Sequence, residues 1–244
     1  FDDVRDGVPE GVGVLINAGG AGTAYSGGSA WADAGLQRAI REFVAGGGGF
    51  IGVGEPTATP SGGAVFQHSD VLGVDREIGW SLSTDRYPVR ESGHFILPGE
   101  VGDDARWGTA RPDVVAVTEG ARVLADDGGA VRAAVNSFGA GRGVYLAGLP
   151  WSVANSRLLH RAIFWAAGRE DELTDLGLAE DPRVEVAVYP QAGWVLVTNI
   201  STEPVATRLK HPWGGLQVDL EPRGFKWLPM RAETTEQTET TTEP

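Results

Sequence analysis

The sequence contains no cysteine, a single methionine, and few basic residues for its length of 244. Without cysteine the chain cannot form disulfides, thiolate nucleophiles, cysteine-ligated zinc sites or iron–sulfur clusters. Lysine and arginine number 20 against 33 aspartates and glutamates, which gives a formal net charge of −13 at pH 7. Because so acidic a chain repels phosphate backbones and anionic lipid surfaces, we expect it to bind neither nucleic acid nor membranes.

Long hydrophobic runs and targeting signals are also missing. No apolar stretch approaches the roughly 20 residues that a membrane span requires. No basic segment followed by an apolar one marks a secretory signal. We therefore expect a cytoplasmic location, and the start at Phe1 rather than at methionine suggests a piece of a longer protein. The four histidines show no spacing typical of metal ligands, so no metal site is predicted.

The first 168 residues alternate short apolar runs with amphipathic stretches, which predicts an α/β domain. Residues 12–16 and 50–53 are typical of buried strands, and the helix between them has Asp33 as a candidate N-cap. This strand–helix–strand spacing indicates a βαβ unit with parallel strands. The pattern further predicts a helix around 64–72, long loops over 75–112, a strand at 114–117, a hairpin at 122–136, a returning antiparallel strand at 144–148 and a helix at 152–167.

The remaining sequence divides into three parts. The acidic residues 169–182 indicate a helix end and a linker. Residues 183–230 contain five short alternating segments separated by turns, which predict a small all-β sandwich that docks on the α/β domain. Residues 231–244 are almost entirely glutamate, threonine and glutamine, a composition that predicts a disordered tail.

The connection over residues 17–28 is the first candidate site. It follows a predicted parallel strand and is longer than a usual βα loop. Its glycines lack the spacing of a dinucleotide site, and no Walker lysine follows. Asn17, Tyr25 and Ser26 could hydrogen-bond a polar ligand such as a sugar, and the glycines would let that ligand approach the backbone closely. Alternatively, the glycines only relieve steric crowding in the loop.

The second candidate is the bend after the next strand, Gly52-Val53-Gly54-Glu55-Pro56. A nucleophile elbow would need serine or cysteine here, so glutaminase chemistry is excluded. Glu55 either accepts hydrogen bonds from a ligand or pairs locally, and both interpretations stay open. No pair of carboxylates stands out for glycoside hydrolysis. Other side chains that could form a polar pocket or offer a ring to a sugar, or simply pack, are His94 with Asp85, Arg86 and Tyr87, and Trp31, Trp80, Trp107 and Trp151.

Several phrases of the sequence resemble one enzyme family in the same order. They are Ile16-Asn17-Ala18-Gly19-Gly20, residues 23–28, residues 47–56, and residues 139–150 continuing into 154–159. These phrases are similar to the middle domain of the lacto-N-biose/galacto-N-biose phosphorylases (1,3-β-galactosyl-N-acetylhexosamine phosphorylases). The resemblance implies a class I glutamine-amidotransferase-like (flavodoxin-like) fold, with a mostly parallel sheet and helices on both faces, followed by the small all-β sandwich.

The resemblance also implies an activity. Inorganic phosphate, as co-substrate, attacks the anomeric carbon of a galactosyl-N-acetylhexosamine with inversion, and α-galactose 1-phosphate is released. A carboxylic acid protonates the departing oxygen, and no other cofactor or metal is implied. In this family the general acid belongs to an N-terminal barrel, so we expect no catalytic residue in this chain and a homodimer in the full enzyme.

The substrate-binding candidates that match family motifs are Asn17, Tyr25, Ser26, Gly27, Gly28 and Glu55. We expect the loop and the bend to lie side by side and to form a support surface for the absent barrel. Alone, the chain should then be inactive. The alternative is a stand-alone, non-catalytic module that binds carbohydrate or serves as a scaffold for oligomerisation.

Overall fold

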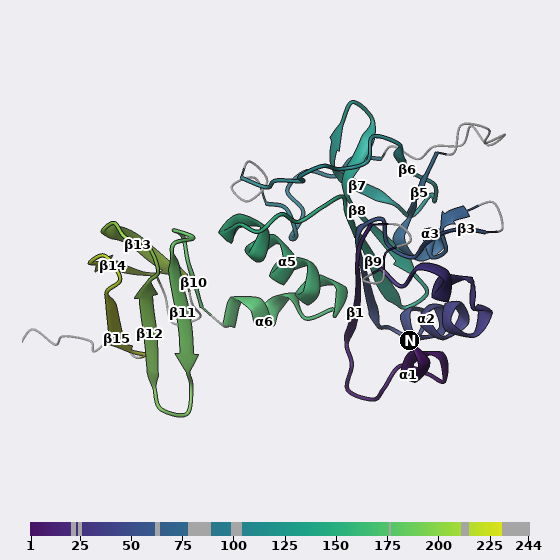
Figure 1. Cartoon of the computed structure of the whole chain (residues 1–244). Coiled ribbons are helices and arrows are strands. Elements are labelled where there is room, and N and C mark those ends of the chain that lie inside the picture. The colour runs from purple at the N-terminus through teal and green to yellow at the C-terminus, as the bar shows by residue number, and fades with distance from the viewer. Residues whose placement is uncertain are drawn as a thin grey trace, which may run out of the picture. The chain divides into compact units, whose positions relative to one another are not determined.

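The computed structural model describes residues 1–20, 23, 26–61, 64–77, 89–98, 104–175, 177–210 and 215–230. The chain divides into two compact units, residues 1–170 and residues 171–244, which are considered separately (Figure 1). Within the described ranges no helix has the length and apolar character needed to cross a membrane.

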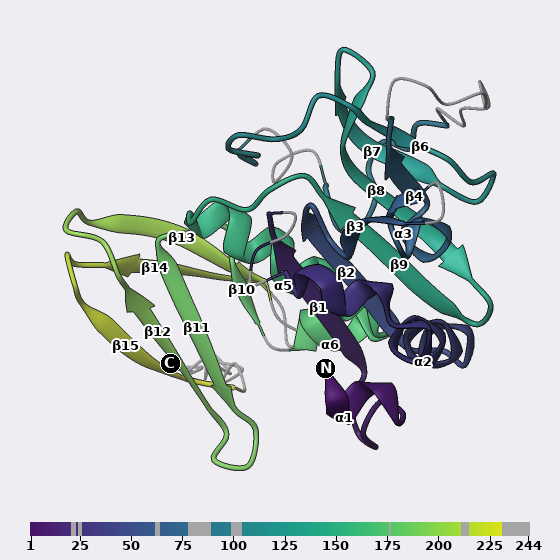
Figure 2. The same cartoon turned by 45° about the vertical axis from the view of Figure 1, so that its right-hand side comes forward.

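The first unit is built on a five-stranded mixed sheet (Figures 1 and 2). The strand order is β1 (Val14–Gly19), β2 (Gly49–Gly54), β9 (Gly141–Leu146), β8 (Ala130–Phe138) and β7 (Arg122–Asp127). β2 pairs in parallel with both β1 and β9, whereas β8 pairs antiparallel with both β9 and β7. The predicted parallel pairing of the first two strands is therefore confirmed.

The predicted amidotransferase-like, flavodoxin-like fold with a mostly parallel sheet is wrong. Only two of the four strand pairings are parallel. The reason is the length of the connections, because residues 128–129 and 139–140 are all that join β7 to β8 and β8 to β9. A parallel crossover needs a dozen or more residues, so connections this short force antiparallel hairpins.

Two small antiparallel sheets add to the strand content of the unit. They are β3 (Ala58–Ser61) with β4 (Ala64–Phe66), and β5 (Val74–Arg76) with β6 (Val114–Ala116). The predicted helix over 64–72 is wrong in its first half, and only α3 (Ser69–Leu72) is helical. The Asp75 carboxylate accepts hydrogen bonds from the backbone amides of Val65 and Phe66, which holds that segment extended.

Side-chain caps begin the two long helices of the unit. The Asp33 carboxylate accepts from the Leu36 amide at 2.8 Å and caps α2 (Ala34–Ala45), as the sequence predicts. The Ser152 hydroxyl accepts from the Asn155 amide at 3.0 Å and caps α5 (Val153–Ala166). Such caps satisfy amides that a helix leaves unpaired. Besides α3, the shorter helical segments of this unit are α1 (Asp2–Arg5) and the 3₁₀ helix η1 (Gly28–Ala32), whereas α6 (Glu170–Asp175) begins at the last residue of the unit and continues into the second unit.

The sheet has a hydrophobic cluster on each face. On one face, α2 and α3 pack on Phe50 and Tyr145; on the other, α5 packs on Ile51 and Leu146. Successive strand residues point to opposite faces, so Phe50 and Ile51 enter different clusters. All four of these side chains are almost completely buried.

The second unit consists of two three-stranded antiparallel sheets that share one hydrophobic cluster. The first contains β10 (Leu178–Ala179), β13 (Val205–Lys210) and β14 (Leu216–Leu220), and the second contains β11 (Val184–Tyr189), β12 (Trp194–Asn199) and β15 (Phe225–Pro229). The five strands predicted over 183–230 are confirmed as β11 to β15. The residues 169–182 contain α6 and β10, and the tail 231–244 lies outside the described residues.

Candidate functional site

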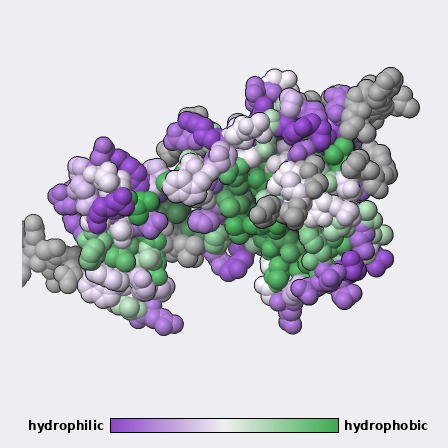
Figure 3. All heavy atoms as spheres, in the orientation of Figure 1, coloured by the Kyte–Doolittle hydropathy of each residue, from purple (hydrophilic) through white to green (hydrophobic). Residues whose placement is uncertain are grey.

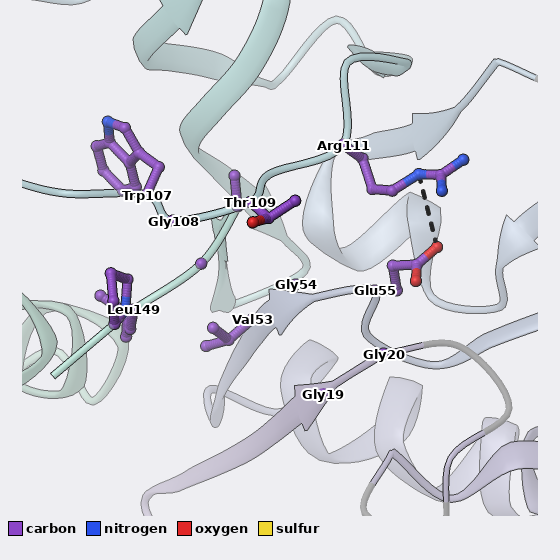
Figure 4. Close-up of a pocket in the computed structure, with 13 residues that line it drawn as sticks. Gly19, Gly20, Val53, Gly54, Glu55, Trp107, Gly108, Thr109, Arg111 and Leu149 are labelled. Atoms are coloured by element: carbon purple, nitrogen blue, oxygen red, sulfur yellow. Dashed lines mark ion pairs between the residues drawn. The ribbon is translucent and has the colours of Figure 1, made fainter.

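A pocket of about 400 Å³ lies where the three parallel strands end (Figure 4). Ligands of α/β sheets favour this carboxyl edge. The wall from the ends of β1 and β2 consists of Gly19, Gly20, Val53, Gly54 and Glu55; the remaining walls are Trp107, Gly108, Thr109 and Arg111, and the segment Ala147–Pro150 that follows β9. The expectation that the glycine loop and the Glu55 bend lie together is confirmed, because the Glu55 amide donates to the Gly19 carbonyl at 2.9 Å.

Glu55 and Arg111 in the pocket wall belong to an ionic cluster that also contains Arg76 and Asp113. Arg76 donates to Glu55 Oε1 at 2.9 Å and to Asp113 Oδ2 at 2.9 Å. Arg111 also contacts both carboxylates, with its Nε 3.2 Å from Asp113 Oδ1 and 3.8 Å from Glu55 Oε1 (Figure 4). The cluster thus contains two positive and two negative groups, and each arginine pairs with both carboxylates.

The contact between Asp113 and Arg111 favours the charged form of both groups. Burial alone would raise the pKa of Asp113, but hydrogen bonds from Arg111 and Arg76 outweigh it and hold the pKa below its usual range. The hydrogen bond to Asp113 likewise raises the pKa of Arg111. Asp113 and Arg111 therefore remain charged near neutral pH.

Asn17 and Ser26 hold the loop rather than line the pocket. The Asn17 amide nitrogen donates to the Ser26 carbonyl at 3.1 Å, and its oxygen accepts from the Thr57 amide at 2.7 Å. The Trp31 indole also donates to the Ser26 carbonyl, and Ser26 is completely buried. The two polar residues therefore connect the glycine loop to the segment after β2.

The other sequence candidates take different positions. A side chain on Gly27 would collide with the Phe1 ring, 2.4 Å away, and the residue has φ of 93°, so only glycine fits there. Gly28 begins η1, and Tyr25 lies outside the described residues. Of the six predicted substrate-binding residues, Glu55 is the one that the structure places in the pocket wall.

The sequence interpretation missed Arg76, Arg111 and Asp113. Arg76 on β5 and Arg111 lie within residues 75–112, which were predicted as long loops, and Asp113 falls between that region and the predicted strand at 114–117, so no periodic pattern identified them. The one local signal is the sequence Arg111-Pro112-Asp113, in which opposite charges two residues apart can pair. The tertiary contact with Glu55 has no counterpart in the sequence.

The histidines do not form a metal centre within the ranges that the structure describes, where no group of three or more potential ligands is found. His160 lies exposed on α5. His94 is half-buried, accepts from the Ile96 amide and packs edge-on against Trp165, and burial lowers its pKa. Its expected neighbours Asp85, Arg86 and Tyr87, together with Trp80, are outside the described residues.

His68 is a core residue in contact with the rings of Trp31 and Phe50. Its Nε2 lies 3.3 Å from the Gln37 carbonyl, whereas its buried Nδ1 has no hydrogen-bond partner in the described part of the chain. Burial, followed by the nearby positive charge of Arg41, lowers the pKa of His68 to about 4; the Gln37 contact and Asp70 oppose this shift. In the folded protein the ring is therefore neutral near pH 7.

This buried histidine makes stability depend on pH. Because the folded pKa is below the unfolded value, its contribution is complete above about pH 6.5 and is lost as the pH falls towards 4. We expect His68 alone to lower the free energy of unfolding by about 2 kcal/mol between pH 7 and pH 5. Urea unfolding at both pH values measures the loss, and His68→Gln should reduce it. An equal loss in that variant would contradict the assignment to His68.

The sequence of the first unit, which forms this pocket, identifies its class of domain. Residues 1–171 match the family model described as the lacto-N-biose phosphorylase central domain. The first unit is therefore a domain of the class found at the centre of sugar phosphorylases. The chain belongs to the lacto-N-biose phosphorylase family, as the resemblance of its motifs indicates.

Curated relatives support the same conclusion. A 1,3-beta-galactosyl-N-acetylhexosamine phosphorylase of Lachnoclostridium phytofermentans is 44% identical over 197 residues, which cover 81% of this chain and 27% of the relative. The corresponding phosphorylase of Bifidobacterium longum subsp. longum is 35% identical over 261 residues, covering 93% of this chain and 35% of the relative. The chain thus spans about a third or less of the length of these relatives.

Among solved structures, the chain is similar to a beta-galactosidase from Bacillus circulans sp. alkalophilus. The TM-score is 0.45 at 21% sequence identity, over 90% of this chain and 33% of that one.

Proposed function

We propose that this chain is the central and C-terminal portion of a 1,3-β-galactosyl-N-acetylhexosamine phosphorylase and that it supports a catalytic barrel outside the chain. The observation that carries the proposal is the match of residues 1–171 to the family's central domain together with 44% identity to one such phosphorylase. Both matches concern a region that forms only a fraction of the relatives' length.

In the proposed reaction, an oxygen of inorganic phosphate bonds to the anomeric carbon of the galactosyl group. The glycosidic bond to the N-acetylhexosamine breaks, and the departing oxygen takes a proton from a carboxylic acid. Glu55 in the pocket wall and Asp113 beside it both accept hydrogen bonds from Arg76 through their carboxylates. This arrangement makes them members of a structural ion-pair network, which supports placing the general acid elsewhere.

An apolar strip on the first unit supports a docking role. β1 is an edge strand of the sheet. Its Ile16 side chain is 47% exposed, and Val12, which precedes the strand, is 37% exposed. Hydrophobic residues gather over this part of the unit in the space-filling view (Figure 3). An open strand edge with apolar side chains is unfavourable in water, and proteins commonly cover such surfaces with another element or partner.

The proposal is tested by comparing the isolated 244-residue chain with the relatives' complete form, using the Bifidobacterium longum phosphorylase as the positive control. Each is given lacto-N-biose and inorganic phosphate, and galactose 1-phosphate is measured. We expect product from the control and none from the isolated chain. Turnover by the isolated chain would contradict a catalytic barrel outside it.

A second experiment tests the role of Glu55 with a pair of variants made in the Bifidobacterium longum phosphorylase, the positive control. Where the control carries glutamate at the positions that align with Glu55 and with exposed Glu42, each is changed to glutamine. Because general acid–base catalysis contributes about 10²–10⁴-fold, a supporting residue should leave kcat within about tenfold of the unchanged enzyme. A loss above a hundredfold for the Glu55 position alone, with a changed pH profile, would place catalysis in this domain.

A further inference from the structure

The two ends of the strand-end pocket differ in chemistry. At one end lie the indole of Trp107 and the side chain of Leu149; at the other lie the ion-paired Glu55 and Arg111 (Figure 4). Thr109, which is exposed, lies between them on the same wall. A ligand matched to this pocket therefore needs an apolar face and a polar edge in one small molecule.

The charge of the polar end favours a neutral ligand. Arg111 and Arg76 are each already paired with the carboxylates of Glu55 and Asp113, so the four groups sum to zero. An anion such as phosphate would meet no net positive charge and would face Glu55. A hydroxyl can donate to the Glu55 carboxylate or accept from the Arg111 guanidinium without disturbing their charges.

We infer that this pocket binds a neutral saccharide, with one sugar face against Trp107 and hydroxyls directed to Glu55 and Arg111. A pyranose ring has both features, an apolar C–H face and an edge of hydroxyls. The volume of about 400 Å³ lies within the range of small-molecule sites. The site is an accessory binding site, and it does not depend on the proposed phosphorylase activity because the chain alone would form it.

The test is a titration of the 244-residue chain with methyl β-galactopyranoside, lacto-N-biose and, separately, inorganic phosphate. Nuclear magnetic resonance of the tryptophan indole groups reports binding. We expect saccharide to shift the Trp107 signal, with saturation in the millimolar range, and phosphate to leave it unchanged. Trp107→Ala should weaken saccharide binding about tenfold or more, as truncation of a central aromatic contact does.

Trp151→Ala is the matched control, because this tryptophan is 90% exposed and does not belong to the pocket wall. It should bind saccharide with unchanged affinity. Trp107 also packs against the core on the α5 side, so Trp107→Ala can affect folding. A second variant, Thr109→Phe, fills the pocket from an exposed position, and Thr202→Phe on an exposed turn of the other unit is its control.

Loss of binding in Thr109→Phe, with retention in Thr202→Phe and equal thermal unfolding, supports the site. Three results would overturn it: no saccharide response, phosphate binding in preference to saccharide, or equal saccharide binding by Thr109→Phe and its control. None of these results bears on whether the longer relatives' form catalyses phosphorolysis, so failure of this inference is distinguishable from failure of the proposed function.

Discussion

Arg76→Met should lower the free energy of unfolding of the first unit by about 3 kcal/mol. The substitution keeps most of the aliphatic stem but removes the guanidinium that donates to both Glu55 and Asp113. The side chains of these three residues are only 18–24% exposed, so the two carboxylates lose a partner in a place that water reaches poorly. The expected value is at the lower end of the cost of breaking a buried ion pair, because some exposure remains.

Urea unfolding followed by circular dichroism measures this loss. Arg38→Met is the matched control, because Arg38 is 69% exposed and lies 3.9 Å from Glu42 on the surface of α2. Such an exposed pair contributes at most about 0.5 kcal/mol. If Arg76→Met cost no more than Arg38→Met, the ionic cluster would not stabilise the pocket wall, and the argument for a fixed polar end would fail.

Gly143→Ala should destabilise the first unit by about 3 kcal/mol or more. Gly143 is on β9, and a methyl group there would lie 2.0 Å from the Val71 carbonyl oxygen, far inside van der Waals contact. The obstructing atom is backbone of α3, which cannot rotate away as a side chain could. Overpacking of this kind typically costs 1–3 kcal/mol and more where the backbone must move, hence the estimate of about 3.

Gly13→Ala tests whether steric collision or glycine loss in general is responsible. The methyl group added at Gly13 would lie 3.9 Å from Ala167 Cβ, an ordinary contact. We expect a change within about 0.5 kcal/mol for this control. Similar thermal midpoints for Gly143→Ala and Gly13→Ala would show that α3 does not pack as closely on β9 as the structure has it.

The neutral ionic cluster connects the stability and the binding arguments. Arg76 does not line the pocket but pairs with Glu55, which lines it and which we propose binds the saccharide hydroxyls. Arg76→Met should therefore also weaken saccharide binding, even under conditions where the variant remains folded. Since Trp107 lies at the other end of the pocket, the contact of the sugar face with its ring should be less affected (Figure 4).

The sequence predicted local features well where the local pattern of residues favours a single structure. Asp33 at the N-terminus of a helix and the short alternating segments after residue 183 correspond to the observed cap and to strands β11–β15. It failed where an apolar run suits two structures. Val65 and Phe66 fit a helix as well as a strand, and the Asp75 carboxylate, which accepts from the amides of both residues, favours the strand.

The site was predicted only in part, for a related reason. Asn17 and Ser26 are polar residues in a glycine-rich loop, a pattern that suits ligand binding and loop bracing equally. The structure uses both for bracing, through Thr57 and Trp31. Glu55 reaches the pocket, whereas its partners Arg76 and Arg111 come from a region without periodic pattern.

The sequence by itself determined the absence of thiol chemistry, the acidic charge, the parallel pairing of the first two strands and, through motif resemblance, the phosphorylase family. These follow from composition, from local periodicity and from runs of matching residues. Only the tertiary structure decided that the sheet is mixed and that Arg76 and Arg111 pair with Glu55 at the pocket. Strand pairing and ion pairing depend on contacts between residues far apart in the chain, and local pattern carries no information about which distant groups meet.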